Sequence, residues 1–170
     1  MNLLKDVPAG TTEEMNVIIE IPKGKQNKYE YDKKHNVFAL DRVLYSPFHY
    51  PADYGFVPGT LCDDGDPLDG FVILNEPTFP GILVKVRPVG VIEMIDNGEQ
   101  DNKLLCVPVD DPYHKNVKDI KDLSDHFLKS VKHFLEHYKD LQGKKVEVTG
   151  IKGVKEAREE FNRAVKRFKK

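Results

Sequence analysis

Apolar residues alternate with polar ones in two early segments of the chain. The alternating apolar positions are Val17, Ile19 and Ile21, and then Phe38, Leu40 and Leu44. Because successive side chains of a strand point to opposite faces, this period predicts half-buried strands. Further candidate strands cover residues 70–74, 82–95 with interruptions at Pro88 and Gly90, 104–109 and 145–151. Short strands separated by clusters of Gly, Pro, Asn and Asp predict a small closed barrel.

The apolar spacing then changes to three or four residues, the period of an amphipathic helix. One helix is predicted to begin after Ser124 as N-cap and to end before Gly143, with an apolar stripe of Phe127, Val131, Phe134 or Leu135, Tyr138 and Leu141. A second covers about 154–168, with a stripe of Ala157, Phe161, Val165 and Phe168. The expected fold class is therefore α+β, mainly β, with a closed barrel and flanking C-terminal helices in a single domain, 1–170.

Composition narrows the class of protein. The 170 residues include 26 Lys and Arg against 28 Asp and Glu, a formal net charge of -2, which argues against both a strongly basic nucleic-acid binder and an acidic disordered chain. The sequence has no run of 18 apolar residues and no secretory segment, so we expect a cytoplasmic protein that does not bind membranes. Cys62 and Cys106 are too few for a disulfide framework, and we expect both to be buried, reduced thiols.

Charge is unevenly distributed, and residues 43–84 contain no Lys or Arg. Asp63, Asp64, Asp66 and Asp69 crowd four carboxylates into seven residues, among Gly and Pro residues that exclude a regular helix. Repulsion raises the pKa of carboxylates crowded in this way, and a bound divalent cation relieves it. Oxygen ligands select hard ions such as Mg²⁺, Mn²⁺ or Ca²⁺. The spacing does not fit an EF-hand, and a solvated acidic turn is the alternative.

A second acidic segment, residues 96–103, follows the strand predicted to end at Ile95. Taken alone, it has the composition of a hairpin tip. If both acidic segments flank strands of one small sheet, they converge and can hold several metal ions, an arrangement used in hydrolytic phosphate chemistry.

Groups suited to hold a phosphate are also present. Lys28 and Glu30 share a face of an extended stretch, and Arg42 lies in an apolar strand, where it alternatively covers apolar surface at a rim. Tyr50 and Tyr54 are mainly expected in the core, but their hydroxyl groups are donors that can reach a phosphate.

These residues together resemble the soluble inorganic pyrophosphatases of the bacterial single-domain type. The segment 64–70, Asp-Gly-Asp-Pro-Leu-Asp-Gly, fits the signature of that family, and supporting strings occur in the family's order at 17–22, 28–32, 40–42, 50–55, 87–91 and 136–141. The resemblance runs over nearly the whole chain. It implies an OB-like five-stranded barrel, usually assembled as a homohexamer, that hydrolyses pyrophosphate to two orthophosphates with Mg²⁺ or Mn²⁺.

The resemblance also implies roles for individual residues. Asp66 is the expected general base, and a metal-activated water is the expected nucleophile. The expected metal ligands are Asp64, Asp69 and Asp101 for the principal ion, Asp69 for a second, Asp96 with Asp101 for a third, and Glu20 and Glu30 for a further ion. The expected phosphate ligands are Lys28, Tyr54 and Lys103 on the attacked phosphate and Arg42, Tyr138 and Lys139 on the leaving phosphate, with Tyr50 lining the site. Asn97 departs from the family, in which an acidic residue is frequent at this position.

Two other interpretations compete with this one. His133, Glu136 and His137 spell the HxxEH string of zinc metallopeptidases on a predicted helix, but short strings often match by chance. With His126 they more simply predict a polar or subunit-contacting stripe. A non-catalytic OB-type binding module, with the basic C-terminal helix as its nucleic-acid or membrane contact, is the second alternative. The P-loop pattern is incomplete around Gly143-Lys144, and the Nudix pattern is incomplete at Ala164.

Overall fold

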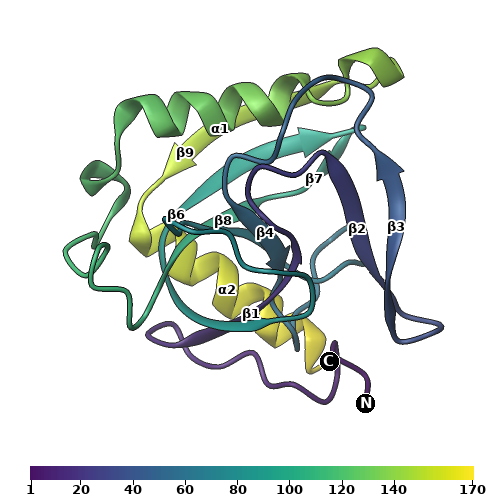
Figure 1. Ribbon diagram of the computed structural model, residues 1–170. Coiled ribbons are helices and arrows are strands. Elements are labelled where there is room, and N and C mark those ends of the chain that lie inside the picture. Colours follow the sequence, from purple (N-terminus) through teal and green to yellow (C-terminus); the bar gives the residue numbers. More distant parts are fainter.

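Five strands close into a barrel in the computed structural model, which describes residues 1–170 (Figure 1). In the order in which they pair around the ring, they are β1 (Met15–Ile21), β4 (Asp53–Phe56), β5 (Asp69–Val72), β8 (Lys103–Pro108) and β6 (Leu83–Asp96). The ring closes because β6 also pairs with β1. Every pair is antiparallel except β5 with β8. The predicted OB-like, mainly β barrel is confirmed.

Four further strands lie outside the ring. β9 (Val146–Lys152) pairs with β6, as does the short β7 (Glu99–Gln100). β2 (Asn27–Asp32) and β3 (Val37–Val43) form a separate hairpin beside the barrel (Figure 1). The strand predicted over residues 38–44 is present as β3, but the predicted buried face is wrong, because Leu40 is 56% exposed and Leu44 is buried only after the strand has ended.

β6 continues for 14 residues through the two positions where the sequence predicts interruptions. A bulge between Pro88 and Gly90 shifts the pairing with β8 by one residue and keeps the strand continuous. Gly90 is required there, because a Cβ atom at this position would lie 2.1 Å from Cγ2 of Ile120. The predicted interruption is thus a bulge inside one long strand.

The two α-helices pack against different core clusters. Val131, Phe134 and Leu135 lie on α1 (Asp125–His137), which packs against β9, and Ala157, Phe161 and Ala164 lie on α2 (Val154–Phe168), which packs mainly against β6. The bounds predicted for α2 and the N-cap Ser124 of α1 are confirmed. Neither helix has the length and apolar character that a bilayer span requires.

Some predicted details of the helices and the thiols were wrong. α1 ends at His137, so Leu141 lies in a 3₁₀ turn, η2 (Asp140–Gln142), and is 66% exposed; another such turn, η1 (Ile120–Asp122), precedes α1. In α2, Ala164 is buried whereas Phe168 is 37% exposed. Cys106 is buried as expected, but Cys62 is only partly buried.

The parallel pair β5–β8 brings the two acidic segments to the same end of the barrel. Asp69, which begins β5, lies opposite Lys103, which begins β8. The first acidic segment leads into β5, and the second leads into β8. Asn97 and Gly98 form the predicted hairpin tip between β6 and β7, where both residues have positive φ values of 51° and 82°, as a two-residue I′ turn requires.

Candidate functional site

A cavity of about 380 Å³ lies where the two acidic segments meet. Seven acidic side chains line it, namely Glu30, Asp64, Asp66, Asp69, Asp96, Glu99 and Asp101. Five basic side chains face them, namely Lys28, Arg42, Lys103, Lys139 and Lys144, together with Tyr54, Tyr138 and Asn97. The predicted convergence of the acidic segments is confirmed, and the lining has an excess of negative charge.

Lys103 is the buried cation of this cluster, with only 5% of its surface exposed. Its Nζ atom donates to Oδ2 of Asp69 at 2.8 Å and to Oδ1 of Asp101 at 2.6 Å. Burial alone lowers the pKa of Lys103, but the two carboxylates outweigh burial and raise this pKa above its ordinary value. Lys103 therefore remains charged and holds the two carboxylates together.

Tyr54 fixes Asp69 from a second side. Its hydroxyl donates to Oδ2 of Asp69 at 2.6 Å, and its ring packs 5.1 Å from that of Phe71. Burial, with the negative charge of Asp69, raises the pKa of Tyr54 well above its ordinary value, so the hydroxyl keeps its proton and remains a donor.

Two carboxyl groups of the cavity have raised pKa values although basic side chains lie near. Burial is the main cause for both Asp64 and Asp101, and neighbouring carboxylates add to it. Lys103 opposes the shift at Asp101 without cancelling it. Additional positive charge in the cavity would stabilise the ionised form of both groups.

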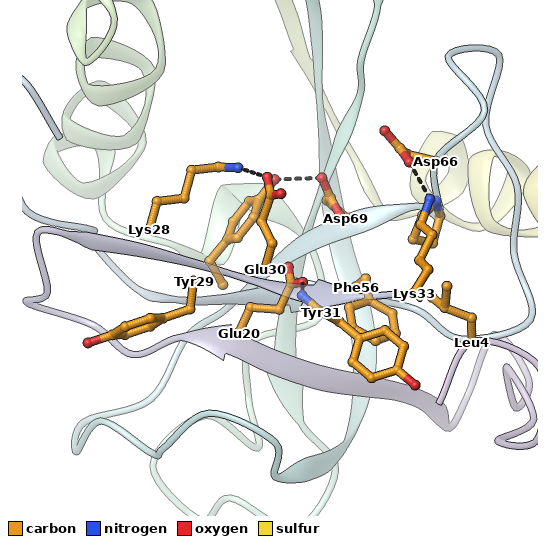
Figure 2. Close-up of a pocket in the computed structure, with 12 residues that line it drawn as sticks. Leu4, Glu20, Lys28, Tyr29, Glu30, Tyr31, Lys33, Phe56, Asp66 and Asp69 are labelled. Atoms are coloured by element: carbon orange, nitrogen blue, oxygen red, sulfur yellow. Dashed lines mark hydrogen bonds and ion pairs between the residues drawn. The ribbon is translucent and has the colours of Figure 1, made fainter. Parts of the chain in front are cut away.

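A smaller pocket of about 130 Å³ adjoins the cavity (Figure 2), and the two share Lys28, Glu30, Tyr54, Asp66 and Asp69. Glu20 of β1 lines this pocket but not the main cavity. It is 9% exposed, and its Oε1 accepts a hydrogen bond from the Tyr31 backbone at 2.8 Å. Burial, reinforced by the charge of Asp69, raises the pKa of Glu20 to about 8.

The β2–β3 hairpin supplies basic side chains to one side of the cavity. Lys28 forms an ion pair with Glu30, and Nη1 of Arg42 donates to Oδ2 of Asp41 at 2.7 Å. The Nε atom of Arg42 is buried and has no hydrogen-bond partner. A buried donor without an acceptor costs about 1–3 kcal/mol, so an anion bound beside Arg42 would remove a penalty.

The end of α1 supplies the opposite basic group. Tyr138 is the C-cap of α1, and Lys139 follows it. Lys139 forms an ion pair with Asp96 of the β6–β7 hairpin. Burial raises the pKa of Tyr138, so its hydroxyl also remains a donor.

Asp66 is the most exposed of the candidate carboxylates in the first acidic segment. Its side chain is 64% exposed, and its Oδ1 lies 2.7 Å from Nζ of Lys33, which comes from the β2–β3 turn (Figure 2). Its backbone N–H donates to Oδ1 of Asp64 at 3.0 Å, which orders the loop around both residues.

The structure brings all but two of the predicted site residues into the main cavity. Glu20 is in the adjoining pocket, and Tyr50 lines neither space, because its ring is buried against Tyr54 and Phe134. The sequence analysis missed Lys33, Glu99 and Lys144. Glu99 lies in the second acidic segment and was available from composition, whereas only the fold brings the two lysines near.

The donor set fits hard divalent ions. All seven acidic groups of the cavity offer oxygen atoms, which Mg²⁺ and Mn²⁺ prefer, and they outnumber the basic groups. No three acidic, His or Cys side chains surround a common point, and Lys103 stands between Asp69 and Asp101. The raised pKa values of Asp64 and Asp101 are the observation that favours an added cation.

The histidines of the HxxEH string lie away from this cavity. The rings of His133 and His137 are 4.5 Å apart, and Nδ1 of His137 lies 2.8 Å from Oδ2 of Asp140. Glu136 instead accepts a hydrogen bond from the Val148 backbone of β9 at 3.4 Å. Glu136 therefore does not join the two histidines in a common site.

Comparison with known proteins agrees with the fold and with the chemistry of the cavity. The profile of the family described as inorganic pyrophosphatase matches residues 17–169. An inorganic pyrophosphatase of Synechocystis is 53% identical over 155 residues, which cover 91% of this chain and 92% of the relative. One of Geobacillus stearothermophilus is 51% identical over 150 residues, or 88% and 91% of the two chains.

Solved structures give the same result. The inorganic pyrophosphatase from Thermus thermophilus matches with a TM-score of 0.96 and 41% identity over 100% of both chains. That from Helicobacter pylori matches with a TM-score of 0.94 and 43% identity over 97% of this chain and 99% of the other. The chain therefore belongs to the inorganic pyrophosphatase family and is an inorganic diphosphatase.

Proposed function

We propose that the main cavity is where the chain hydrolyses inorganic pyrophosphate to two orthophosphates, with several Mg²⁺ ions, or Mn²⁺ in their place. The observation that carries this proposal is the lining of the cavity, where seven acidic side chains face five basic ones. Pyrophosphate is compact and multiply charged. A site for it needs carboxylates to hold cations and separate cationic donors to hold the phosphate oxygens.

We assign the metal ligands as the resemblance implies. Asp64, Asp69 and Asp101 would hold the principal ion, Asp69 would share a second, Asp96 with Asp101 would hold a third, and Glu20 and Glu30 would reach a further ion. When bound, such ions neutralise phosphate oxygens and lower the pKa of a bound water from its high ordinary value towards about 7. The oxygen-only donors and the raised pKa values of Asp64 and Asp101 support this assignment.

The attacked phosphate would be held by Lys28, Tyr54 and Lys103. Lys103 and the Tyr54 hydroxyl both donate to Asp69, so these donors are held beside the proposed metal ligand before substrate binds. Donors fixed in advance stabilise charge in the transition state without further reorganisation. In this assignment, Lys103 serves both the carboxylates and the substrate.

Asp66 would accept the proton of the attacking water. A new bond forms between the water oxygen and one phosphorus atom, and the bond from that phosphorus to the bridging oxygen breaks. The bridging oxygen leaves with the second phosphate and takes the electron pair of the broken bond. Arg42, Tyr138 and Lys139 would stabilise the negative charge that develops on this leaving phosphate. The buried, unpaired Nε of Arg42 supports its part in this role.

The test is orthophosphate release from pyrophosphate with Mg²⁺, with excess EDTA and with Zn²⁺ replacing Mg²⁺. We expect rapid release with Mg²⁺ only, and a turnover about 10²–10⁴-fold lower in Asp66→Asn, because a positioned general base contributes that span. The variant also controls for a contaminating phosphatase. Near-normal turnover in Asp66→Asn would refute its role as base, and no release from the folded wild-type protein would favour the binding module instead.

We also propose that the chain assembles as a homohexamer in the cytoplasm. The hairpin strand β3 and the loop that follows it expose large apolar side chains: Val37, Leu40 and Tyr45 are 51%, 56% and 63% exposed. Several large exposed apolar side chains on and next to one strand favour a subunit contact at this hairpin. Light scattering coupled to size exclusion should give the mass of six chains, and a monomer mass at micromolar concentration would contradict the assembly.

A further inference from the structure

α2 contacts both acidic segments without lining either the cavity or the adjoining pocket. Its buried residues Phe161 and Ala164 belong to the same core cluster as Leu68 and Leu104. Leu68 immediately precedes Asp69, and Leu104 immediately follows Lys103. α2 therefore belongs to the same core cluster as residues adjacent to Asp69 and Lys103.

The first specific contact is between Glu160 of α2 and the second acidic segment. Asn102 is 8% exposed, and its Nδ2 donates to Oε2 of Glu160 at 3.1 Å. Its Oδ1 accepts from the backbone of Met94 at 3.3 Å, and the backbone N–H of Asp101 donates to the Met94 carbonyl at 2.9 Å. Side chains alternate along this extended segment, so Asp101 and Lys103 line the cavity while Asn102 turns to the helix.

The second contact is between the end of α2 and the first acidic segment. Nη2 of Arg167 lies 2.6 Å from Oδ1 of Asp63, and the Leu61 backbone donates to the Ala164 carbonyl at 3.1 Å. The Cys62 backbone in turn donates to the Asp66 carbonyl at 2.7 Å, which closes the loop around Asp64. α2 thus contacts each acidic segment at a residue next to a proposed metal ligand. Asn102 is adjacent to Asp101, and Asp63 is adjacent to Asp64.

We propose that α2 sets the spacing between the two acidic segments, with Glu160 and Arg167 as positioning residues for Mg²⁺ binding. The inference rests on the proposed function, because it takes Asp64, Asp69 and Asp101 as the metal ligands. Carboxylates that repel one another stay close only if contacts outside the cavity hold their backbones. Partners behind metal ligands typically change metal affinity by about 10–100-fold when removed.

The two contacts differ in strength. The Glu160 side chain is 12% exposed and its partner Asn102 is buried, so loss of this hydrogen bond leaves a buried amide without an acceptor. Arg167 and Asp63 are 33% and 62% exposed, and water replaces much of their interaction. Glu160 is therefore the main contact, and Arg167 is the weaker one.

Calorimetric titration with Mg²⁺ in the absence of pyrophosphate tests the role of Glu160. We expect the Mg²⁺ dissociation constant to rise about 10-fold in Glu160→Ala, at the lower end of the range for such partners. Glu160→Gln loses the charge but keeps an oxygen acceptor for Asn102, so it should bind Mg²⁺ nearly as wild type does. Glu159→Ala is the matched control, because its exposed neighbouring side chain has no hydrogen-bond or ion-pair partner.

Labelling of Cys62 with an aromatic disulfide reagent tests Arg167 without any metal. Cys62 lies in the loop that Arg167 holds and is partly buried, whereas Cys106 is completely buried and should not react in the folded protein. We expect the labelling rate to rise about two- to fivefold in Arg167→Ala, the change that an exposed ion pair supports. Arg158→Ala removes an unpaired, exposed arginine of the same helix and should label as wild type does.

The proposal is overturned if Glu160→Ala binds Mg²⁺ like wild type, or if Glu160→Ala and Glu160→Gln weaken binding equally, since charge alone would then be responsible. It is equally overturned if Arg167→Ala labels no faster than Arg158→Ala. A wild-type protein that binds Mg²⁺ but releases no orthophosphate would refute the proposed function alone. The titration and the labelling need no turnover, so they still decide whether α2 positions the acidic segments.

Discussion

Replacing Lys103 with methionine tests whether this lysine is the counter-ion that holds the acidic cavity together. Methionine keeps much of the apolar stem but removes the ammonium group, which bridges Asp69 and Asp101 at 2.8 and 2.6 Å. Two carboxylates then face each other without their nearest cation. We expect a folded but less stable protein whose stability depends more strongly on Mg²⁺.

The size of the effect follows from burial. Removing one partner of a buried ion pair destabilises a protein by about 3–5 kcal/mol. The side chains of Asp69 and Asp101 are each 23% exposed, so water compensates in part, and we expect a loss of about 3 kcal/mol. For a domain of this size, that corresponds to a fall in Tm of about 6–12 °C. A Mg²⁺ concentration 100 times the variant's dissociation constant stabilises the variant by about 2.7 kcal/mol, and we expect wild type to gain less at the same concentration because Lys103 already neutralises its carboxylates.

The pH dependence of the stability of Lys103→Met provides a second test of the role of this lysine. The pKa of Asp101 is already raised by burial, and loss of the lysine raises it further. The folded variant then binds more protons than the unfolded chain, so its deficit relative to wild type shrinks as pH falls from 8 towards 5. In wild type the raised pKa of Lys103 lies far above this window, and its charge contributes equally throughout.

The assay is urea unfolding in EDTA at several pH values, repeated with increasing Mg²⁺. Lys129→Met is the control, because this lysine of α1 is exposed and has no hydrogen-bond or ion-pair partner. The reasoning fails if Lys103→Met unfolds within about 0.5 kcal/mol of wild type. It also fails if Mg²⁺ stabilises the two proteins equally.

Two other positions give independent tests. Glu20 in the folded protein keeps its proton up to about pH 8, whereas in the unfolded chain it releases the proton near pH 4.5. The wild-type protein therefore loses stability as the pH rises from about 4.5 to about 8. Glu20→Gln should therefore gain Tm relative to wild type from pH 5 to pH 8.5 in EDTA, and a constant difference would contradict the burial argument. Asp53 is completely buried and accepts hydrogen bonds from the Lys23 backbone and from the backbone and hydroxyl of Thr78. Asp53→Ala should lower the free energy of unfolding by about 3 kcal/mol in urea titrations, and a loss below about 1 kcal/mol would show that water replaces the carboxylate.

The parts of the fold that follow a clear period could be predicted from the sequence. α2 was found within its bounds because a stripe of small and aromatic residues repeats at helical spacing. β4 was missed because its four residues, Asp53–Phe56, are all buried and do not alternate. The bulge in β6 looked like a break, because Pro and Gly have the same local signature in both cases.

The candidate site was predictable to the extent that its residues are crowded in sequence. The two acidic segments could be identified from composition, and their convergence could be predicted once both were assigned to one small sheet. Lys33 and Lys144 gave no such signal, because lysines are common on surfaces and only tertiary packing selects these two. Sequence alone gives no indication of the roles of Asn102, Glu160 and Arg167, for the same reason. Their contacts join residues that are 58 and 104 positions apart.

The parallel register of Asp69 with Lys103 has a consequence for the order of folding. Their strands are neighbours in space but are joined through β6, which must cross the sheet before β8 can align with β5. The pairing joins residues 34 positions apart, and the entropy of closing the intervening chain is lost before the contact is made. The charged cavity is complete only once β8 has paired with β5, so we expect a metal ion that needs both acidic segments to bind after that step and to slow the unfolding of the finished barrel.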